Sequence, residues 1–307
     1  MVTLDIVIVN WNSGELLNNC LNSIDKSNII GFLINIVVVD NASSDDSLNG
    51  LTYKGKYILL KNNENIGFAK ACNVGLMQSS SKYILFLNPD AEVRENTIQK
   101  AVNKMETNEN ISVLGVKYID ENGNVAPSCS RFPKLRYYFY DIIGLSKINP
   151  KLFYHATIMS DMDYSKSTFV DEVSGAFYFC RKSVLDRVGG FDERYFVYYE
   201  ELDLSYRIKK SGGAIFYDAD NEIYHKGGGV SDQVKAKRLL YNLRSRIEYS
   251  FKHFSNFKAI VLFILTMFFE PFTRLVYLII GGRFTEINDL VRGYYYLFQY
   301  YIFRKNI

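Results

Sequence analysis

The sequence predicts an α/β protein with a mostly parallel sheet that is covered by helices on both faces. Strand–helix alternation, with strands buried on both faces, is typical of such sheets. Segments with the helical spacing of apolar residues separate the predicted strands. Five short runs in the first 120 residues are apolar on both faces and favour β structure: Leu4–Val9, Ile34–Val39, Tyr57–Leu60, Tyr83–Leu87 and Ile111–Val116.

The predicted helices follow the strands in chain order. A short polar helix is expected after Ser44, and residues 120–124 (Asp-Glu-Asn-Gly-Asn) predict a turn. The other three helices are marked by apolar residues three or four positions apart: Leu16, Leu17, Cys20, Leu21 and Ile24; Ala69, Cys72 and Leu76 with Asn73; Ile98, Val102 and Met105.

Residues 126–168 lack periodicity and are expected to form a long loop. The block 169–225 predicts a strand at Val170–Cys180, helices from Ser183 and from about Glu200, and strands near Ile215 and Ile223. Residues 232–255 predict a basic helix. Residues 257–281 predict two apolar helices in the membrane interface. Charged residues interrupt this segment and leave an uncharged run of about eleven residues, whereas a membrane-spanning helix needs roughly 20.

Charge is distributed unevenly along the 307 residues, although the net charge is only +3. Residues 226–307 carry 13 Lys/Arg and 5 Asp/Glu, whereas the first 225 residues carry 23 and 28. An acidic front half suits metal and polar-substrate chemistry, and a basic, aromatic tail suits an anionic surface, either lipid phosphate or nucleic acid. The four cysteines form no C-x-x-C pair, which fits a reducing cytosol.

Polar residues follow the carboxyl ends of the predicted strands, where ligands of parallel sheets bind. Any one of them is an ordinary turn or cap residue, but four groups at one sheet edge indicate a binding site. The groups are Asn10 and Asn12; Asp40 and Asn41; Asn65, Gly67, Lys70 and Asn73; and Asn88 and Asp90.

Together these groups resemble the nucleotide-binding half of family 2 glycosyltransferases, and most closely the rhamnosyltransferase-like branch, over about residues 4–228. The resemblance implies the GT-A fold, a Rossmann-like sheet. It also implies that Asp40 accepts the N3–H of a uracil or thymine ring. The implied donor-binding residues are Asn10, Asn12, Asp40, Asn41, Asn65, Gly67, Lys70 and Asn73.

The same resemblance implies Mg²⁺ or Mn²⁺ on the donor diphosphate. The family usually carries Asp-x-Asp after the fourth strand, and here Asn88 replaces the first acid while Asp90 remains as the expected ligand. A metal that bridges two phosphates needs only one or two carboxylates. His225, which precedes Lys226 and the glycines at 227–229, is implied as a third ligand, since neutral imidazole binds such metals and glycines let backbone amides approach phosphate.

The catalytic half resembles the family at residues 173–177, 189–193 and 198–204. The resemblance implies an acceptor and sugar pocket at Gly175 and Ala176, with Glu200 and Asp203, and a general base in the acidic pair near residue 200. Family members usually read Glu-Asp there, so Glu201 takes the base position. A carboxylate in a first helical turn is expected to stay ionised near neutral pH. One proton acceptor suffices for inversion.

The sequence therefore predicts an inverting, metal-dependent sugar transferase at the cytoplasmic face of the membrane. Expected partners are dTDP-rhamnose or a UDP-sugar, a polyprenyl-diphosphate-linked glycan of a bacterial cell-surface polysaccharide, and the inner leaflet, with no nucleic acid. Alternatives are a UDP-hexose transferase, a sugar-nucleotide pyrophosphorylase and a nucleic-acid-binding protein. Expected domains are 1–228, with a nucleotide-binding half at 1–120 and a catalytic half at 169–228, and a helical extension at 229–307.

Overall fold

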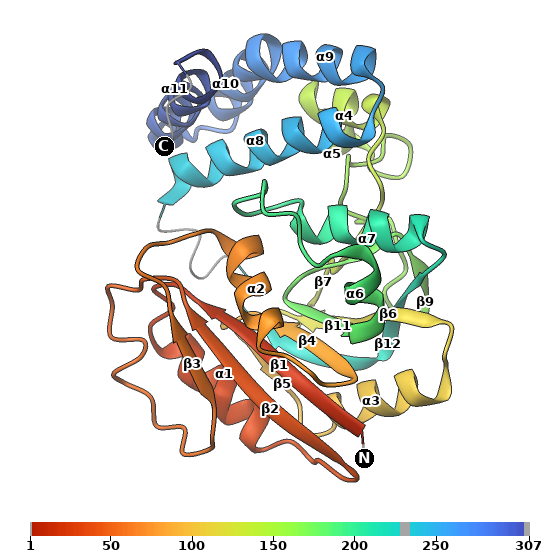
Figure 1. The fold of residues 1–307 in the computed structure, drawn as a ribbon. Coiled ribbons are helices and arrows are strands. Elements are labelled where there is room, and N and C mark those ends of the chain that lie inside the picture. The colour runs from red at the N-terminus through yellow and green to blue at the C-terminus, as the bar shows by residue number, and fades with distance from the viewer. Residues whose placement is uncertain (1, 228–233, 304–307) are drawn as a thin grey trace. The chain divides into compact units, whose positions relative to one another are not determined.

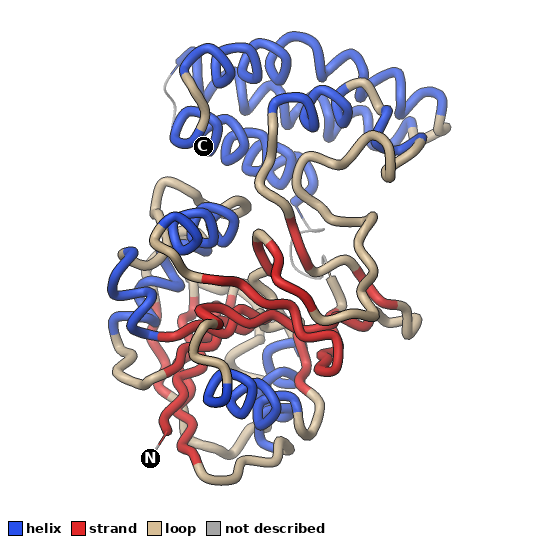
Figure 2. Tube along the Cα trace, turned by 90° about the vertical axis from the view of Figure 1, so that its right-hand side faces the viewer, coloured by secondary structure: helices blue, strands red, loops and turns tan. Residues whose placement is uncertain are grey.

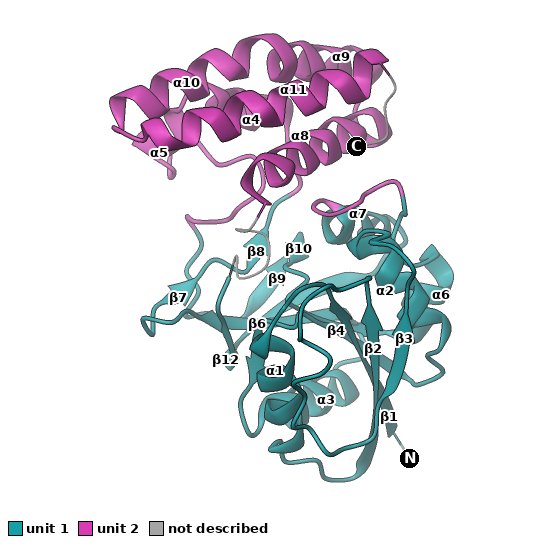
Figure 3. Ribbon diagram, turned by 90° about the vertical axis from the view of Figure 1, so that its left-hand side faces the viewer, with its two compact units in different colours: residues 1–131, 162–193, 200–230 teal, residues 132–161, 194–199, 231–307 magenta. Residues whose placement is uncertain are grey.

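The computed structural model describes residues 2–227 and 234–303, in two compact units (Figure 3). Unit 1 comprises residues 1–131, 162–193 and 200–230, and unit 2 comprises residues 132–161, 194–199 and 231–307. The prediction that one domain ends at residue 228 and another follows it is not tested by these two units and stays a prediction. In the structure, two segments from the first 228 residues belong to the same unit as the tail.

Unit 1 is built on a sheet with the strand order β3-β2-β1-β4-β11-β6-β12-β5 (Figure 1). The pairs among β3, β2, β1 and β4 are parallel, as is the β12–β6 pair, whereas β11 is antiparallel to β4 and β6 and β5 is antiparallel to β12. The bounds are β1 Val2–Asn10, β2 Phe32–Asp40, β3 Ile58–Lys61, β4 Tyr83–Leu87, β5 Ala91–Val93, β6 Ile111–Ile119, β11 Phe177–Arg181 and β12 Ala214–His225. The predicted mostly parallel α/β fold is confirmed.

Helices cover both faces of this sheet because its strands are apolar on both sides. The apolar sides of α1 (Glu15–Asp25) and α3 (Thr97–Thr107) share one core with the residues of β1 at positions 4, 6 and 8. The opposite face is covered in part by α2 (Phe68–Met77), whose Gly75 lies against Val7; a Cβ there would stand 2.3 Å from a Val7 methyl carbon. Also in unit 1 are α6 (Lys182–Val188) and α7 (Glu200–Lys210).

Three predictions of secondary structure were wrong. The predicted loop 126–168 contains α4 (Leu135–Ile142) and α5 (Leu145–Ile148), where Tyr137, Tyr138 and Ile142 are buried. No helix follows Ser44, where the chain makes turns. The predicted strand Val170–Cys180 is divided into β9 (Thr168–Val170), β10 (Glu172–Val173) and β11, and β10 pairs with β8 (Cys129–Ser130) in a separate sheet. The remaining strand, β7 (Val125–Ala126), pairs with β6 beyond the predicted turn.

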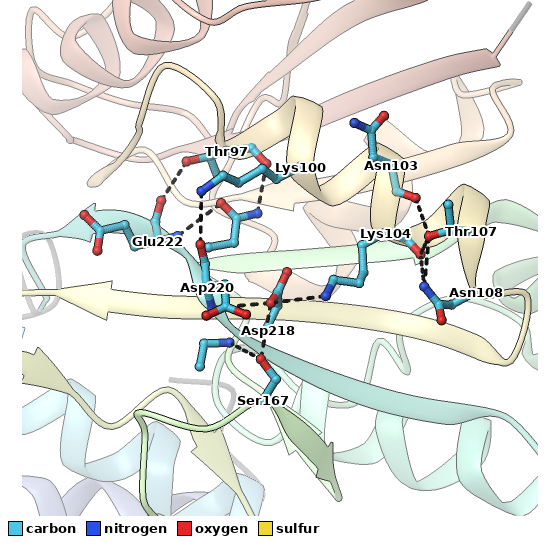
Figure 4. Close-up of polar contacts among 12 residues, drawn as sticks. Thr97, Lys100, Asn103, Lys104, Thr107, Asn108, Ser167, Asp218, Asp220 and Glu222 are labelled. Atoms are coloured by element: carbon cyan, nitrogen blue, oxygen red, sulfur yellow. Dashed lines mark hydrogen bonds and ion pairs between the residues drawn. The ribbon is translucent and has the colours of Figure 1, made fainter.

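A bulge in β12 interrupts its pairing with β6 just before the residues that also pair with β5. Asp218 pairs with Val116 and Glu222 with Lys117, so three residues of β12 have no partner on β6. Side chains of α3 fix the bulge (Figure 4): Lys100 Nζ donates to the Asp220 carbonyl at 3.1 Å, and Lys104 Nζ lies 3.7 Å from Asp218 Oδ1. Bulges redirect a strand and its side chains. Here the redirected end of β12 carries His225, opposite Ala91 of β5.

Helices make up unit 2 (Figure 2), where α4 and α5 are joined by α8 (Lys235–His253), α9 (Asn256–Ile264), α10 (Glu270–Ile280) and α11 (Ile287–Phe303). A π-helical turn (Leu265–Phe269) joins α9 to α10, and a 3-10 turn (Phe284–Glu286) precedes α11. The two predicted apolar helices correspond to α9 and α10, which the π-helical turn joins without a break. The argument that this segment is too short for a span was wrong, and its position in the membrane interface stays a prediction. Asn256–Ile280 is one 25-residue helix whose length and composition would allow it to cross a membrane.

Candidate active site

Asn10 and Asp40 end two neighbouring parallel strands and face each other in register. Asn10 is fully buried, and its Nδ2 donates to Asp40 Oδ1 at 2.8 Å and to Ser47 Oγ at 2.9 Å. Asp40 Oδ2 also accepts the backbone N–H of Ser43 at 3.3 Å. The structure therefore brings these two predicted residues together and fixes the orientation of the Asp40 carboxylate.

Asn12 fixes the loop beyond these strands. It has a φ of 48°, in the left-handed region that asparagine tolerates better than most residues. Its backbone N–H donates to Ser43 Oγ at 3.0 Å, and its Oδ1 accepts the Ser44 N–H at 2.7 Å. Asn12 thereby ties the loop after β1 to the loop after β2.

Asn41 and Asn65 hold the loop that leads into α2. Asn41 Nδ2 donates to Asn65 Oδ1 at 2.8 Å, and Asn41 Oδ1 accepts the Ile66 N–H at 3.1 Å. Asn65 Oδ1 also accepts the N–H of Gly67, whose φ of 87° starts the helix. Lys70, in the first turn of α2, is exposed. We call Asn10, Asp40, Asn41 and Asn65 the asparagine edge.

Asn73 connects α2 to the glycine-rich turn after α6. Its Nδ2 donates to the Phe191 carbonyl at 2.9 Å and to Glu193 Oε1 at 3.1 Å, and its Oδ1 accepts the Phe191 N–H at 2.9 Å. The Asn73 amide is thus engaged in positioning residues 191–193. The turn begins at Gly189, whose φ of 88° ends α6.

Asp90 and His225 meet where β5 pairs with the redirected end of β12. His225 Nε2 lies 3.4 Å from Asp90 Oδ1, and the imidazole packs edge-on against Tyr118 with ring centroids 5.1 Å apart. Asn88 Oδ1, in the same turn as Asp90, is buried without a hydrogen-bond partner. Of the implied glycines, 228 and 229 lie outside the described residues. Among the described residues no group of three His, Cys, Asp or Glu could hold a metal ion.

Glu201 lies directly against the Gly175 backbone. The Gly175 N–H donates to Glu201 Oε1 at 3.2 Å, and a Cβ at position 175 would stand only 2.7 Å from that oxygen. Glycine is therefore required at 175 for the carboxylate to approach. The next residue, Ala176, accepts the Asn88 N–H at 3.1 Å through its carbonyl oxygen. This backbone contact links the turn that carries Gly175, between β10 and β11, to the turn that carries Asp90.

A third acid, Glu172 on β10, belongs with Glu200 and Glu201, and we call the three the carboxylate cluster. Glu172 and Glu200 are only 3 % and 2 % exposed, and one carboxyl oxygen of each has no hydrogen-bond partner. Burial and the charge of Glu201 raise the Glu172 pKa to about 8. The sequence analysis missed Glu172, which follows another acid, Asp171, and whose burial depends on the pairing of β10 with β8.

The pKa values of the helical pair are raised as well. Burial and the neighbouring Glu201 charge raise the Glu200 pKa well above its ordinary value. Burial also raises the Glu201 pKa, although hydrogen bonds from the Gly175 N–H and from the Glu200 carboxyl oppose the shift. Desolvation therefore opposes the stabilisation that a helix N-terminus gives a carboxylate, and the expected ionised state of Glu201 near neutral pH stays a prediction. The carboxyl groups of Glu200 and Glu201 are hydrogen-bonded to each other.

Asp203, one turn into α7, lies in an ion pair. It is fully buried, and its Oδ2 accepts from Arg207 Nε at 2.7 Å. Arg207 also donates to the Val188 carbonyl at 2.8 Å and to the Gly190 carbonyl at 2.7 Å. The pair therefore fixes the end of α6 and the glycine-rich turn against α7. The predicted role of Asp203 toward an acceptor stays a prediction.

The sequence profile of glycosyl transferase family 2 matches residues 5–169, which is more than half of the chain. Among curated relatives, the N-acetylglucosaminyl-diphospho-decaprenol L-rhamnosyltransferase of Mycobacterium tuberculosis is 25 % identical over 255 residues, covering 79 % of this chain and 82 % of the relative. The dTDP-rhamnosyl transferase RfbF of Shigella flexneri is 25 % identical over 207 residues, covering 65 % and 62 %.

The fold is similar to that of solved transferases. A mannosyltransferase of Pyrobaculum calidifontis, solved with GDP-mannose and Mn²⁺, covers 99 % of this chain and 88 % of its own, with a TM-score of 0.57 and 14 % identity. GalNAc-T7, solved with UDP, GalNAc and Mn²⁺, covers 74 % of this chain and 44 % of its own, with a TM-score of 0.55 and 17 % identity.

Sheet order, post-strand polar residues and these similarities define an enzyme that transfers sugars, with a GT-A fold. The chain belongs to glycosyl transferase family 2, and its activity falls in the glycan-synthesising class of that family. Among the predicted alternatives, family membership decides for a glycosyltransferase and against a sugar-nucleotide pyrophosphorylase.

Proposed function

We propose that this enzyme transfers a sugar with inversion from a nucleotide-diphosphate donor, with Glu201 as the general base. The observation that carries the proposal is the carboxylate cluster: Glu201 accepts hydrogen bonds from the Gly175 N–H and from the Glu200 carboxyl, beside the backbone link to the Asp90 turn. These two donors orient the carboxylate, and its raised pKa makes it a stronger proton acceptor.

In the proposed reaction an acceptor hydroxyl attacks the anomeric carbon of the donor sugar. The hydroxyl proton passes to the Glu201 carboxylate as the new glycosidic bond forms. The bond between the anomeric carbon and the diphosphate oxygen breaks, and the nucleotide diphosphate leaves with the electron pair. Glu200 is proposed as a positioning residue, because its raised pKa favours the protonated form, which can donate a hydrogen bond to Glu201.

Asp40 is proposed to bind the nucleobase. Its carboxylate is oriented by Asn10 and by the Ser43 N–H, as a single acceptor for a ring N–H requires. Asn41 and Asn73, which were also predicted to bind the donor, have side-chain amides that are hydrogen-bonded within the protein and position loops. Lys70 is the exposed cation of this group and suits a phosphate.

Asp90, His225 and Asn88 fit a divalent metal. The Asp90 carboxylate and the His225 imidazole lie 3.4 Å apart. In the same turn as Asp90, the buried Asn88 Oδ1 has no hydrogen-bond donor. Such ligands suit Mg²⁺ or Mn²⁺ when phosphates and water complete the shell. A bound ion would neutralise charge on the departing diphosphate. The Mn²⁺ in two structural neighbours is a further argument for this choice.

The proposed donor is dTDP-rhamnose and the proposed acceptor a polyprenyl-diphosphate-linked glycan of a cell-surface polysaccharide, at the cytoplasmic face of the membrane. The activities of two relatives, rhamnosyl transfer to a diphospho-decaprenol and dTDP-rhamnosyl transfer, support this choice. A hexose from a UDP-sugar is the second candidate, because other relatives are N-acetylglucosaminyltransferases of Staphylococcus aureus.

Membrane association is proposed to involve the continuous apolar helix. Only 28 % of its most apolar 18-residue window is buried, and Phe257, Phe268, Phe272 and Ile280 are exposed. Glu270 in the same helix is buried in an ion pair with Arg246 of α8. One face is thus packed in unit 2 and the other is apolar and open, as in a helix that lies in the membrane interface.

The experiment is a donor panel with the purified full chain. dTDP-rhamnose, UDP-glucose, UDP-N-acetylglucosamine and GDP-mannose are each supplied with a polyprenyl-diphosphate-linked N-acetylglucosamine, and the product is analysed for anomeric configuration. We expect transfer from dTDP-rhamnose with inversion. Retention of configuration would exclude single displacement by Glu201, and transfer from a UDP-sugar alone would establish the second candidate.

A further inference from the structure

A groove of about 1170 Å³ lies wholly within unit 2. Its lining comes from α4 and α5, the segment 155–158, Tyr198 and Tyr199, α8, α10, the 3-10 turn and the start of α11. None of the residues proposed for sugar transfer lines it. The volume exceeds what a bare phosphate requires and falls in the range that holds a molecule of drug size or larger. The groove is therefore a second candidate site.

Two buried donor groups in this groove have no hydrogen-bond partner. Ser146 on α5 is 1 % exposed and its Oγ is unpaired, and Arg246 on α8 is 5 % exposed and its Nε is unpaired. The other Arg246 nitrogens are occupied, since they bond to Thr266 Oγ1 at 2.9 Å and to the Glu270 carboxylate. Buried unpaired donors are costly, and a ligand with anionic oxygens would satisfy both.

The charge around the groove also favours an anion. Six Lys or Arg residues line it against four Asp or Glu residues. Of these, Glu270 is shared by two arginines, Arg246 and Arg274, which leaves an excess positive charge in the wall. Lys147 and Lys235 are exposed at the groove. Cations of this kind bind phosphate groups.

An apolar wall accompanies the cations. Phe272, Val276 and Ile280 follow one another at intervals of four residues on α10, and their side chains are 68 %, 53 % and 81 % exposed. Ile148 on α5, which is 77 % exposed, lines the same groove. An inorganic phosphate would leave this wall in water. A ligand with a hydrocarbon chain would cover it, at about 25 cal/mol for each Å² removed from water.

We propose that the groove binds the phosphate group and the adjoining hydrocarbon chain of a polyprenyl phosphate, the lipid carrier of the acceptor. The inference rests on the proposed function for its choice of lipid, because a membrane phospholipid shares the same two features. Ser146 and Arg246 donate to the phosphate oxygens, Lys147 and Lys235 balance its charge, and the exposed face of α10 packs against the chain.

Binding of three probes to the full chain in detergent micelles tests this assignment: a polyprenyl monophosphate, phosphatidylglycerol and inorganic phosphate. Ser146→Ala removes an unpaired hydroxyl, so the ligand-free variant should unfold at an unchanged or higher temperature. It should bind the polyprenyl phosphate about 10- to 100-fold more weakly, the fold-change typical for one lost hydrogen bond to a charged group. Lys235→Gln should weaken binding in the same direction.

The matched control is Lys258→Gln, an exposed lysine of the same unit that does not line the groove, and its affinity should be unchanged. The assignment is overturned if Ser146→Ala and Lys235→Gln bind as the unaltered chain does. It is also overturned if phosphatidylglycerol or inorganic phosphate binds as tightly as the polyprenyl phosphate and responds to the same variants.

The sugar-transfer assay separates this inference from the proposed function. If the chain transfers sugar to a polyprenyl-linked acceptor while both groove variants bind normally, the groove assignment is wrong and the function stands. If polyprenyl phosphate binds as expected but no nucleotide sugar is transferred to any polyprenyl-linked acceptor, the proposed function is wrong and the groove stands.

Discussion

The asparagine edge and the carboxylate cluster of unit 1 use buried polar side chains in opposite ways. At the asparagine edge, hydrogen bonds occupy the side chains: Asn41 alone donates to Asn65 and Gly67 and accepts from Asn62 and Ile66. In the carboxylate cluster, Glu172 and Glu200 each keep an unpaired buried oxygen, and the pKa values of all three acids are raised. Both regions bury polar side chains, but only at the asparagine edge do hydrogen bonds satisfy them.

This difference distinguishes side chains that hold the backbone in place from side chains that are available to a substrate. A saturated side chain holds the backbone and has little capacity left for a ligand, whereas an unsatisfied one gains when a substrate arrives. We therefore expect substitutions at the carboxylate cluster and the adjacent metal turn to act on turnover. Substitutions of the three asparagines of the asparagine edge should act on stability, whereas Asp40 keeps its proposed role toward the nucleobase.

Asp90→Ala should have a larger effect than the Gly175, Asn41 and Glu172 variants described below. Loss of the one carboxylate in the metal turn should reduce turnover with Mg²⁺ or Mn²⁺ by about 10³-fold, since a metal contributes several kcal/mol to transition-state stabilisation. Steady-state transfer measures the loss, and circular dichroism checks the fold. Asp186→Ala, at an exposed acid of α6, is the control. Full activity of the unaltered enzyme in excess chelator would contradict the metal assignment.

Gly175→Ala should lower the rate of the chemical step by about 10- to 100-fold. The new Cβ would stand 2.7 Å from Glu201 Oε1, and the flexible carboxylate would move rather than the backbone. Misplacement of a reacting group by about 1 Å costs rate on this scale. The free energy of unfolding should change little. Gly50→Ala, whose Cβ meets only an ordinary contact at 3.4 Å, is the control. Normal transfer by Gly175→Ala would contradict the assignment of Glu201 as the general base.

Asn41→Ala should act mainly on stability. The change leaves buried partners around Gly67 unpaired, and we expect a loss of about 1–3 kcal/mol in the free energy of unfolding. Urea titration measures the loss against Asn63→Ala, an exposed neighbour in the same loop. At a temperature where the variant stays folded, turnover should fall less than tenfold. A folded but inactive variant would mean that Asn41 contacts the donor.

Glu172→Gln tests the pH dependence. The folded-state Glu172 pKa of about 8 lies above the ordinary value of 4.5, so its stabilising proton is fully present below pH 4.5 and is lost as the pH rises through 8. The unaltered protein should therefore lose up to about 1.4 kcal/mol per pH unit in this window through Glu172. Glu172→Gln should flatten the slope of urea stability from pH 5 to 8, whereas the exposed Glu121→Gln should not. Equal slopes would show that Glu172 does not titrate there.

The sequence predicted the first half of the fold well because local patterns determine it. The five predicted strands correspond to β1, β2, β3, β4 and β6, and the apolar spacing in three segments corresponds to α1, α2 and α3. Periodicity failed at residues 135–148, where the buried residues of α4 are two tyrosines and one isoleucine and the pattern is too short to identify a helix.

The site was predictable where it depends on residue type and unpredictable where it depends on long-range contacts. The acids that begin α7 could be found from the sequence, since helix and charge coincide at Glu200 and Glu201. Glu172 could not, because β10 is only two residues long and its position depends on pairing with β8. The meeting of His225 with Asp90 likewise depends on the three-residue bulge of β12.

The most direct test of the account is a single-turnover comparison of Glu201→Gln and Glu200→Gln, with donor affinity measured separately. Glu201→Gln should keep donor affinity and slow the chemical step by roughly 10²–10⁴-fold. Glu200→Gln should stay close to the unaltered rate, because the glutamine amide can donate the same hydrogen bond to Glu201. Glu201→Asp, one methylene shorter, should retain partial activity. If Glu200→Gln is the inactive variant and Glu201→Gln transfers normally, the base has been assigned to the wrong residue of the pair.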